Sequence, residues 1–452
     1  MSTQSPKNEE RESQLKGITR ITVRGYKALW EERSIEICPL TILAGANSSG
    51  KSSIMQPLLM LKQTLDETYD PGALLLDGPH VRFTSADQFL SNLLGQTPTD
   101  SFTIKLGCDG DQTLTLTFRK RRTRTIELVE MRYEVDSQAV AFQPRMTHEE
   151  IESVVPESVK HLRQQVSEAE EKLLEWGVYR NRCFFELGLY PKDSGEEGFY
   201  RFSGITPATL LFEPHIRRII HVPALRGNPE RTYKTTAISD RFPGTFENYV
   251  ASFVDHWQTS KSPNLKRLGD TLEALGLTWK VEKRRVADTR VEIRVGRLPH
   301  SIRGGAKDVV NIADVGFGVS QSLPVLVALI VAEPGQLVYL EQPEIHLHPR
   351  AQVALAQALA NAANRGVRVV VETHSALLLL AIQSLVAEGT LSPELAKLHW
   401  FERRGVDGVT EVTSAALDEA GAFGDWPEDF TDVELNLQSR YLDASEVRMG
   451  SY

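Results

Sequence analysis

The segment Gly45–Ser52 constrains the fold of this chain more than any other part of the sequence. It reads Gly-Ala-Asn-Ser-Ser-Gly-Lys-Ser and has the form G-x-x-x-x-G-K-S. The apolar run at 40–44 predicts a buried strand before it, and Ser53–Leu65 carries apolar residues near helical spacing after it. Strand, glycine-rich loop and helix in this order are the context in which the pattern forms a phosphate-binding loop. The sequence therefore predicts a P-loop within an α/β fold.

The residue types in this loop suit a bound triphosphate and a magnesium ion. Glycines let backbone N–H groups turn inward around an anion, and the start of the following helix adds partial positive charge. Lys51 is expected to reach the β- and γ-phosphates, and the Ser52 hydroxyl is expected to hold Mg²⁺. Pro57 should kink or delay the helix because it removes a hydrogen bond. The loop residues predicted to bind the nucleotide are Gly45, Asn47, Ser48, Ser49, Gly50, Lys51, Ser52 and Ser53.

Composition limits the class of protein. The chain has 452 residues with 25% charged residues and a net charge of −9, which is ordinary for a globular protein and argues against a general polyanion-binding surface. Its three cysteines are far apart, so we expect no disulfide framework and a cytoplasmic location. Residues 1–16 lack an apolar core and are expected to be a disordered lead-in, not a signal peptide. No apolar run is long enough to span a membrane.

The order of predicted elements divides the chain into regions. Short apolar strands alternate with helices in the last third, which implies a mostly parallel sheet flanked by helices. We see no internal repeat. The expected regions are the N-terminal part of a nucleotide-binding head with a β-rich lobe (17–140), a helical and mixed α/β insertion (141–300), the C-terminal part of the head (301–415) and a peripheral segment (416–452).

A carboxylate at the end of a second buried strand is expected to complete the metal site. Four apolar residues end in Glu341, which should lie beside the Mg²⁺ bound by Ser52. The next residue is Gln342, and an amide can orient water but cannot accept its proton. We therefore expect slow hydrolysis, with Glu344 as an alternative base. A later strand leads into His374, which we expect to contact the γ-phosphate or the attacking water.

Two other patterns leave alternatives open. His346 and His348, with Glu344, form either a metal site or, as we favour, the cap of a following helix. The basic clusters at 119–124 and 283–285 are either solvated hairpin tips or contacts to a DNA backbone. Aromatic residues do not interleave with these clusters, so stacking on single-stranded DNA is not indicated.

The motifs together resemble an ABC-type ATPase of the RecF/SMC/OLD branch, over roughly residues 18–415. The resemblance is carried by Gly45–Ser52, Glu341–Glu344 and Thr373–Ser375. Residues 314–324 resemble the signature segment of this branch, which reaches the partner's nucleotide across a dimer. The usual Ser-Gly-Gly-Gln is replaced here, and the residues at its place that we expect to contact nucleotide are Gly318, Ser320 and Gln321. Ser320 and the N–H groups of a helix beginning at Gln321 are the expected donors.

The resemblance implies ATP and Mg²⁺ as cofactors and a homodimer, or a higher multiple of dimers, that sandwiches ATP. Residues 221–226 resemble an element of stand-alone prokaryotic ATPases, many tied to phage defence. The favoured hypothesis is a slow ATPase that senses DNA or a phage protein and controls a separately encoded effector such as a nuclease, as in Septu or PARIS systems. Asp429, Asp432 and Glu434 lie in too short a tail for a nuclease domain, so we expect none built in. The alternatives are a RecF-like DNA-repair or DNA-clamping ATPase and a nucleotide-binding scaffold without turnover.

Overall fold

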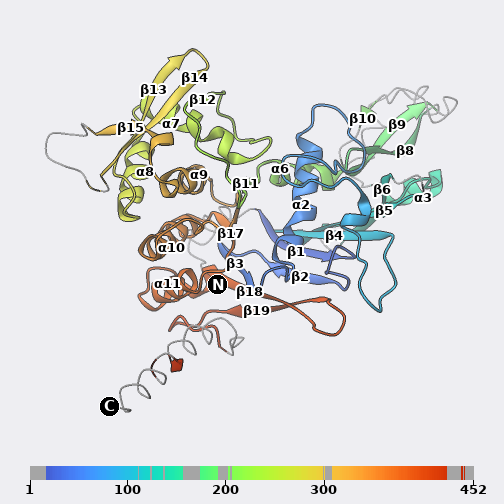
Figure 1. Ribbon diagram of the computed structural model, residues 1–452. Helices are drawn as coiled ribbons and strands as arrows, with labels where there is room; N and C mark the ends of the chain where they lie inside the picture. Colours follow the sequence, from blue (N-terminus) through green and yellow to red (C-terminus); the bar gives the residue numbers. More distant parts are fainter. Residues whose placement is uncertain are drawn as a thin grey trace, which may run out of the picture.

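A six-stranded sheet carries the P-loop strand near its middle (Figure 1). The computed structural model describes residues 17–109, 111–122, 125–135, 138–155, 174–191, 202–203, 206–298, 300, 308–424, 439–440 and 442. Five strands of this sheet run parallel, and the edge strand β19 is antiparallel to β18. In sheet order the strands are β11 (Ile220–Val222), β16 (Leu337–Glu341), β17 (Arg368–Glu372), β3 (Leu40–Gly45), β18 (Ala396–Arg403) and β19 (Thr410–Ala416).

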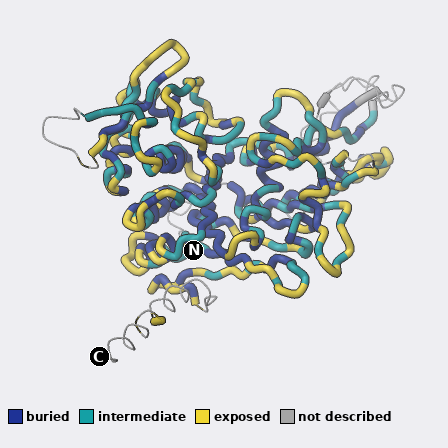
Figure 2. Tube along the Cα trace, in the orientation of Figure 1, coloured by how far each residue is buried: buried dark blue, intermediate teal, exposed yellow. Residues whose placement is uncertain are grey.

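Helices cover both faces of this sheet, as the continuous apolar strands predict. One face packs against helices α9 (Phe317–Val331), α10 (Pro349–Ala363) and α11 (Ala376–Ala387). The other face packs against α2 (Lys51–Asp66) and the N-terminal sheet. Ile42 lies in the first core and Leu43 in the second, because successive side chains of a strand point to opposite faces. Figure 2 shows the buried backbone concentrated along this sheet.

The N-terminal lobe is an antiparallel sheet, which confirms the predicted β-rich lobe. In β4 every second residue is buried, as expected for a sheet with one wet face. The sheet order is β2 (Arg33–Glu36), β1 (Ile18–Arg24), β4 (Ser101–Cys108), β5 (Gln112–Lys120), β6 (Ile126–Val135) and β7 (Gln138–Phe142).

The region between the two halves of the head is mixed, with helices and two small sheets. Figure 1 shows one part beside the N-terminal lobe and the other above α9 and α10. The first part comprises α3 (His148–Val154), β8 (Leu174–Asn181), β9 (Phe184–Pro191), β10 (Phe202–Ser203) and α6 (Pro207–Arg217). The second comprises β12 (Tyr233–Lys234), α7 (Val250–Thr259), α8 (Pro263–Ala274), β13 (Val281–Ala287), β14 (Arg290–Gly296) and β15 (Val309–Asn311). Short 3₁₀ turns are η1 (Ala86–Gln88), η3 (Phe246–Tyr249), η4 (Ile312–Asp314) and η5 (Pro393–Leu395).

The structure also bears on the expectations for Pro57 and for membrane-spanning helices. Helix α2 begins at Lys51 and continues through Pro57, so the proline does not delay it. Eleven other residues of this helix are buried, and their packing rather than the local sequence holds this turn helical. Within the described part of the chain, none of the helices has the length and apolar character needed to cross a membrane. The tail carboxylates Asp429, Asp432 and Glu434 lie outside the described residues.

Candidate nucleotide-binding site

The P-loop turns tightly between β3 and α2, and its glycines are required by close contacts. Gly45 has φ 136°, and a Cβ there would lie 2.1 Å from the Phe401 carbonyl oxygen. Gly50 has φ 111°, and a Cβ there would lie 2.7 Å from the Thr410 hydroxyl. Only glycine adopts these angles without strain. Strand β18 and the start of β19 therefore press directly against the loop and set its shape.

Lys51 lies inside the loop that it is predicted to serve. Its Nζ donates to the carbonyl oxygens of Gly45 at 2.9 Å and Ala46 at 2.8 Å. Burial lowers the pKa of Lys51, and the nearby Glu372 partly offsets this. A phosphate oxygen is a stronger acceptor than a carbonyl, so a triphosphate in the loop would compete for this ammonium group.

A cavity of about 510 Å³ lies over the loop and is lined by residues of the loop. This volume is within the usual range for small-molecule sites. Lys27, Gln56 and Arg403 also line it, and the sequence analysis did not single them out. Lys27 donates to Gln56 Oε1 at 2.7 Å. The predicted residues that line the cavity are Asn47, Ser48, Ser49, Gly50, Lys51, Ser52, Ser53, Gln342 and His374.

The carboxylate next to Ser52 is Glu372, which the sequence analysis did not assign. Ser52 Oγ donates to Glu372 Oε1 at 2.9 Å, and the Tyr339 hydroxyl donates to Glu372 Oε2 at 2.8 Å. The sequence analysis expected Glu341 at this position. In the sheet, β17 pairs with β3 and lies between it and β16, the strand that ends in Glu341. The sequence shows that Glu372 ends a buried strand, but it does not show that this strand pairs with β3.

Glu341 is held by a different set of groups. Its Oε1 lies 3.2 Å from His221 Nε2, and its Oε2 accepts from the Ala224 N–H at 3.1 Å. Burial alone would raise the pKa of Glu341, but the hydrogen bonds from His221 and the Ala224 N–H lower it overall. His221 Nδ1 lies 2.9 Å from His80 Nδ1, and burial holds the pKa of His80 well below its ordinary value. These distances are satisfied when neutral His80 donates from Nδ1 to His221 Nδ1 and His221 donates from Nε2 to Glu341.

The remaining predicted catalytic residues divide between the cavity and the interior. Gln342 has φ 42°, and its N–H donates to the Glu372 carbonyl at 2.8 Å. Glu344 is 7% exposed and accepts from the Thr373 hydroxyl at 2.6 Å and the His374 N–H at 3.1 Å. It holds the turn before α11 and does not line the cavity. Burial lowers the pKa of His374, and the charge of Lys51 lowers it further, so His374 is neutral near pH 7.

The signature segment lies at the start of α9, away from the P-loop cavity. The helix begins at Phe317, not at Gln321 as expected, so its free N–H groups belong to Phe317, Gly318 and Val319. Ser320 Oγ donates to the Phe317 carbonyl at 3.1 Å. The Gln321 side chain is buried and donates to two backbone carbonyls of the 226–227 turn. Gln321 is thus committed to the fold of its own chain.

Arg226 links the signature segment to the end of β16. Its guanidinium donates to the carbonyl oxygens of Gln321 at 3.1 Å, Glu341 at 2.8 Å and Gln342 at 3.1 Å. Burial lowers the pKa of Arg226 to about 10, and nearby carboxylates oppose this. The sequence analysis noticed the 221–226 element only as a family resemblance, and the structure gives it this contact role.

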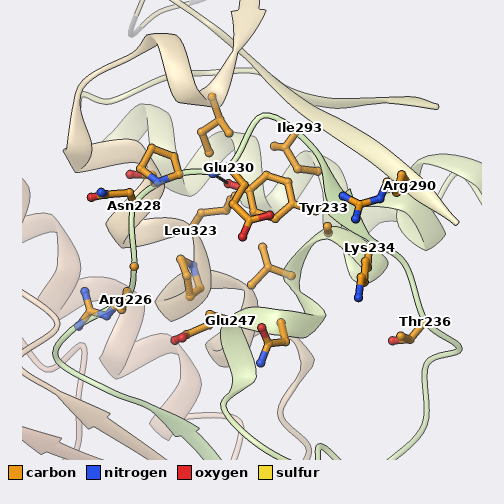
Figure 3. A pocket seen from close by; sticks show the side chains of 18 residues that line it. Arg226, Asn228, Glu230, Tyr233, Lys234, Thr236, Glu247, Arg290, Ile293 and Leu323 are labelled. Carbon is orange, nitrogen blue, oxygen red and sulfur yellow. Dashed lines mark hydrogen bonds between the residues drawn. The ribbon is translucent and has the colours of Figure 1, made fainter. Parts of the chain in front are cut away.

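A second cavity of about 560 Å³ adjoins the signature segment (Figure 3). Figure 3 shows Arg226 and Asn228 on one side, with Arg290, Lys234 and Thr236 on the opposite side. Ser320 also lines this cavity. Ser320, a residue of the predicted signature segment, therefore lines a cavity between α9 and the insertion. This cavity is separate from the P-loop cavity.

The structure also shows the surroundings of His348 and of the two basic clusters. His348 caps α10 by accepting from the Arg350 N–H, as we favoured, and no group of three or more metal-type ligands occurs among the described residues. The basic clusters face acidic partners. These ion pairs are Arg119 with Asp100, Lys120 with Asp87, Arg121 with Glu127, Lys283 with Asp255, Arg284 with Glu292 and Arg285 with Asp255.

Comparison with known proteins gives one family match and several loose structural similarities. Residues 193–381 match the family described as "AAA domain, putative AbiEii toxin, Type IV TA system". No curated protein matches the sequence. The matched stretch contains the signature segment, Glu341 and His374 but not the P-loop.

SMC heads are among the similar solved structures. An SMC head bound to the C-winged helix domain of ScpA has 13% identity and a TM-score of 0.47, covering 89% of this chain and 99% of that chain. The SMC head domain of Thermotoga maritima has 12% identity and a TM-score of 0.38, covering 88% and 98%. The SMC head from Pyrococcus furiosus bound to the C-terminal domain of ScpA has 11% identity and a TM-score of 0.43, covering 89% and 96%. TM-scores below 0.5 are too low to argue from.

The fold assignment therefore rests on the sheet order and the P-loop geometry. Parallel strands flanked by helices, with a P-loop on an inner strand, form an α/β head of the ABC ATPase kind. The matched family is described as an AAA domain, and the assembled P-loop is in keeping with an ATPase.

Proposed function

We propose that this protein is a slow ATPase whose ATP-bound dimer acts as a switch for a separately encoded effector, in antiviral defence. The observation that carries the proposal is a complete phosphate site without a carboxylate at the position of the base. The description of the matched family names a type IV TA system, which is in keeping with such a role.

The residues of the loop fit a nucleotide and a magnesium ion. The loop offers turned backbone N–H groups, an ammonium group and a serine hydroxyl, and the hydroxyl of Ser49 is buried with no hydrogen-bond partner among the described residues. Ser52 and an adjacent carboxylate supply the oxygen ligands that Mg²⁺ prefers. When bound, the ion would neutralise negative charge on the phosphates.

Slow turnover follows from the groups around the cavity. Gln342 lines the cavity at the expected position of the base, and an amide cannot accept a proton from water near pH 7. Glu344 accepts hydrogen bonds from Thr373 and His374 at Oε1 and does not line the cavity, which disfavours it as a substitute. Neutral His374 can orient a water molecule. The ATP-bound state would therefore be long-lived, as a switch requires.

Contacts through Arg226 give the switch a physical path. The same guanidinium holds a carbonyl of the signature helix and two carbonyls beside the cavity. If nucleotide binding moved Gln342, it would move one of the carbonyl groups that Arg226 binds. Because Arg226 also binds the Gln321 carbonyl in α9, the movement would reach that helix. The two segments thus respond together.

Two exposed apolar side chains are in keeping with docking of a second copy. Leu225, next to Arg226 in the chain, is 90% exposed, and Phe317 at the start of α9 is 52% exposed. We propose that ATP joins two copies across this surface.

The test combines mass and turnover. Light scattering is recorded with ATP, with ADP and without nucleotide, and phosphate release is measured for wild type, Lys51→Ala, Gln342→Glu and Glu344→Gln. We expect ATP-dependent dimers, slow release by wild type, loss of both in Lys51→Ala, faster release in Gln342→Glu and little change in Glu344→Gln. Monomers under all conditions, or rapid release by wild type, would refute the switch.

Gln342 also favours a second candidate, a nucleotide-held scaffold without turnover. It predicts ATP-dependent dimers and no phosphate release by wild type. The RecF-like alternative is less favoured, because the described cations of the basic clusters are largely paired with acids. DNA-stimulated phosphate release at low salt would restore it.

A further inference from the structure

We infer that Thr410 is a positioning residue for the phosphate site, and that its hydroxyl holds the Ser49–Gly50 peptide so that the Gly50 N–H faces a bound phosphate. The inference rests on the proposed ATP-binding function. It assigns this role to the first residue of β19, which lies 361 positions from Ser49 in the sequence.

The hydrogen bond from Thr410 fixes one peptide group of the loop. Thr410 Oγ1 donates to the Ser49 carbonyl oxygen at 2.8 Å, and the threonine is fully buried. In a planar trans peptide, the carbonyl and the N–H of the next residue point in opposite directions. The Gly50 N–H therefore points away from Thr410. Gly50 lines the P-loop cavity and Thr410 does not, so this N–H is turned toward the cavity.

The local sequence does not fix the orientation of this peptide. Gly50 has φ 111°, and glycine adopts positive and negative φ almost equally well. The peptide before it can therefore rotate at low cost in an isolated loop. A rotated peptide would turn the Ser49 carbonyl oxygen, with its partial negative charge, toward the phosphates. The hydroxyl of Thr410 opposes this rotation, because a buried carbonyl that loses its donor is destabilised.

Thr410 is itself held in place by segments beside the cavity. Its N–H donates to the Ala28 carbonyl at 2.8 Å, and its carbonyl accepts from Arg33 Nε at 2.9 Å. In the β18–β19 pair it lies opposite Arg403, and both Ala28 and Arg403 line the P-loop cavity. A Cβ on Gly50 would lie 2.7 Å from the Thr410 hydroxyl, so the threonine packs directly on the loop. The backbone that carries the hydroxyl is therefore fixed relative to the loop.

The experiment measures phosphate affinity in variants of the full chain. Thr410→Val removes the hydroxyl and keeps the branched shape, and Thr410→Ser keeps the hydroxyl. The dissociation constant is determined for a fluorescent ATP analogue and, by competition, for inorganic triphosphate, both with Mg²⁺. We expect Thr410→Val to weaken the binding of both ligands by about fivefold or more, because only a fraction of the loops would then present the N–H. Thr410→Ser should stay within about twofold of wild type.

Thr278→Val is the matched control, because Thr278 makes the same kind of bond elsewhere. It is fully buried in the insertion, and its hydroxyl donates to the Gly296 carbonyl at 2.8 Å. Thr278 does not line the P-loop cavity. Urea unfolding should show a loss of stability in both valine variants, whereas only Thr410→Val should lose affinity at a temperature where both are folded. If Thr410→Val does not fold, Thr410→Ala is compared with Thr410→Ser in the same way.

The outcomes separate the inference from the function beneath it. Wild-type affinity in a folded variant without the hydroxyl, or an equal loss of affinity in Thr278→Val, would overturn the inference and leave the proposed function standing. A loss for the ATP analogue with none for inorganic triphosphate would also overturn it, because the Gly50 N–H serves the phosphates. Wild type that binds neither ligand would refute the proposed function, and the inference with it.

Discussion

Replacement of Arg226 by lysine tests whether this residue joins the signature segment to the end of β16. The guanidinium makes four hydrogen bonds to backbone carbonyls, those of Pro223, Gln321, Glu341 and Gln342. A lysine has a single nitrogen, so we expect it to keep at most two of these bonds. Each buried acceptor left unpaired costs about 1–3 kcal/mol. With two lost bonds and partial relaxation, Arg226→Lys should lower the free energy of unfolding by about 2–4 kcal/mol.

Urea unfolding followed by circular dichroism measures this loss, with exposed Arg290→Lys as the control. Arg290 lines the second cavity, and its one side-chain hydrogen bond to Thr232 is at the surface, so its replacement should cost less than about 0.5 kcal/mol. Phosphate release by Arg226→Lys should also fall at a temperature where it is still folded. A loss of stability below about 1 kcal/mol, with normal release, would refute the contact role of Arg226.

Three other predictions follow from single contacts. Gly45→Ala should abolish nucleotide binding and cost at least about 1–3 kcal/mol, because its Cβ would overlap the Phe401 carbonyl; binding of a fluorescent ATP analogue and urea unfolding check this, and normal binding would contradict it. Leu225→Ser should weaken the ATP-dependent dimer without lowering monomer stability, since the side chain is exposed; an unchanged mass by light scattering would exclude Leu225 from the interface. Burial lowers the pKa of His399, so the unfolded chain takes up a proton more readily than the folded one below about pH 6.5. As the pH is lowered below that value, this residue should reduce the free energy of unfolding by up to about 1.4 kcal/mol per pH unit. Unfolding experiments at several pH values should show a smaller reduction for His399→Gln.

Local patterns were sufficient for the elements and for the loop. The G-x-x-x-x-G-K-S pattern and the apolar run before it predicted β3 and a helix after the loop, because strand formation and the loop's glycine requirement depend on neighbouring residues. The same holds for the parallel sheet, whose buried strands are continuous apolar runs. The cap formed by His348 is likewise a short-range effect.

Positions that depend on the order of strands could not be read from the sequence. Glu341 and Glu372 both end buried strands, and only the pairing of β17 with β3 brings Glu372 to Ser52. The start of α9 at Phe317 likewise depends on its packing against distant segments, since its first turn has weak helical signals.

By itself, the sequence determined the chemistry available to this protein: a loop that can enclose a phosphate, and an amide where a base is expected. Only the tertiary structure decided which side chains lie beside the loop, placing Glu372 next to Ser52 and turning Glu344 into the interior. The physical reason is range. Backbone angles and hydrophobic periodicity act over a few neighbouring residues, whereas the neighbours of a carboxylate are set by strands that lie hundreds of positions apart in the chain.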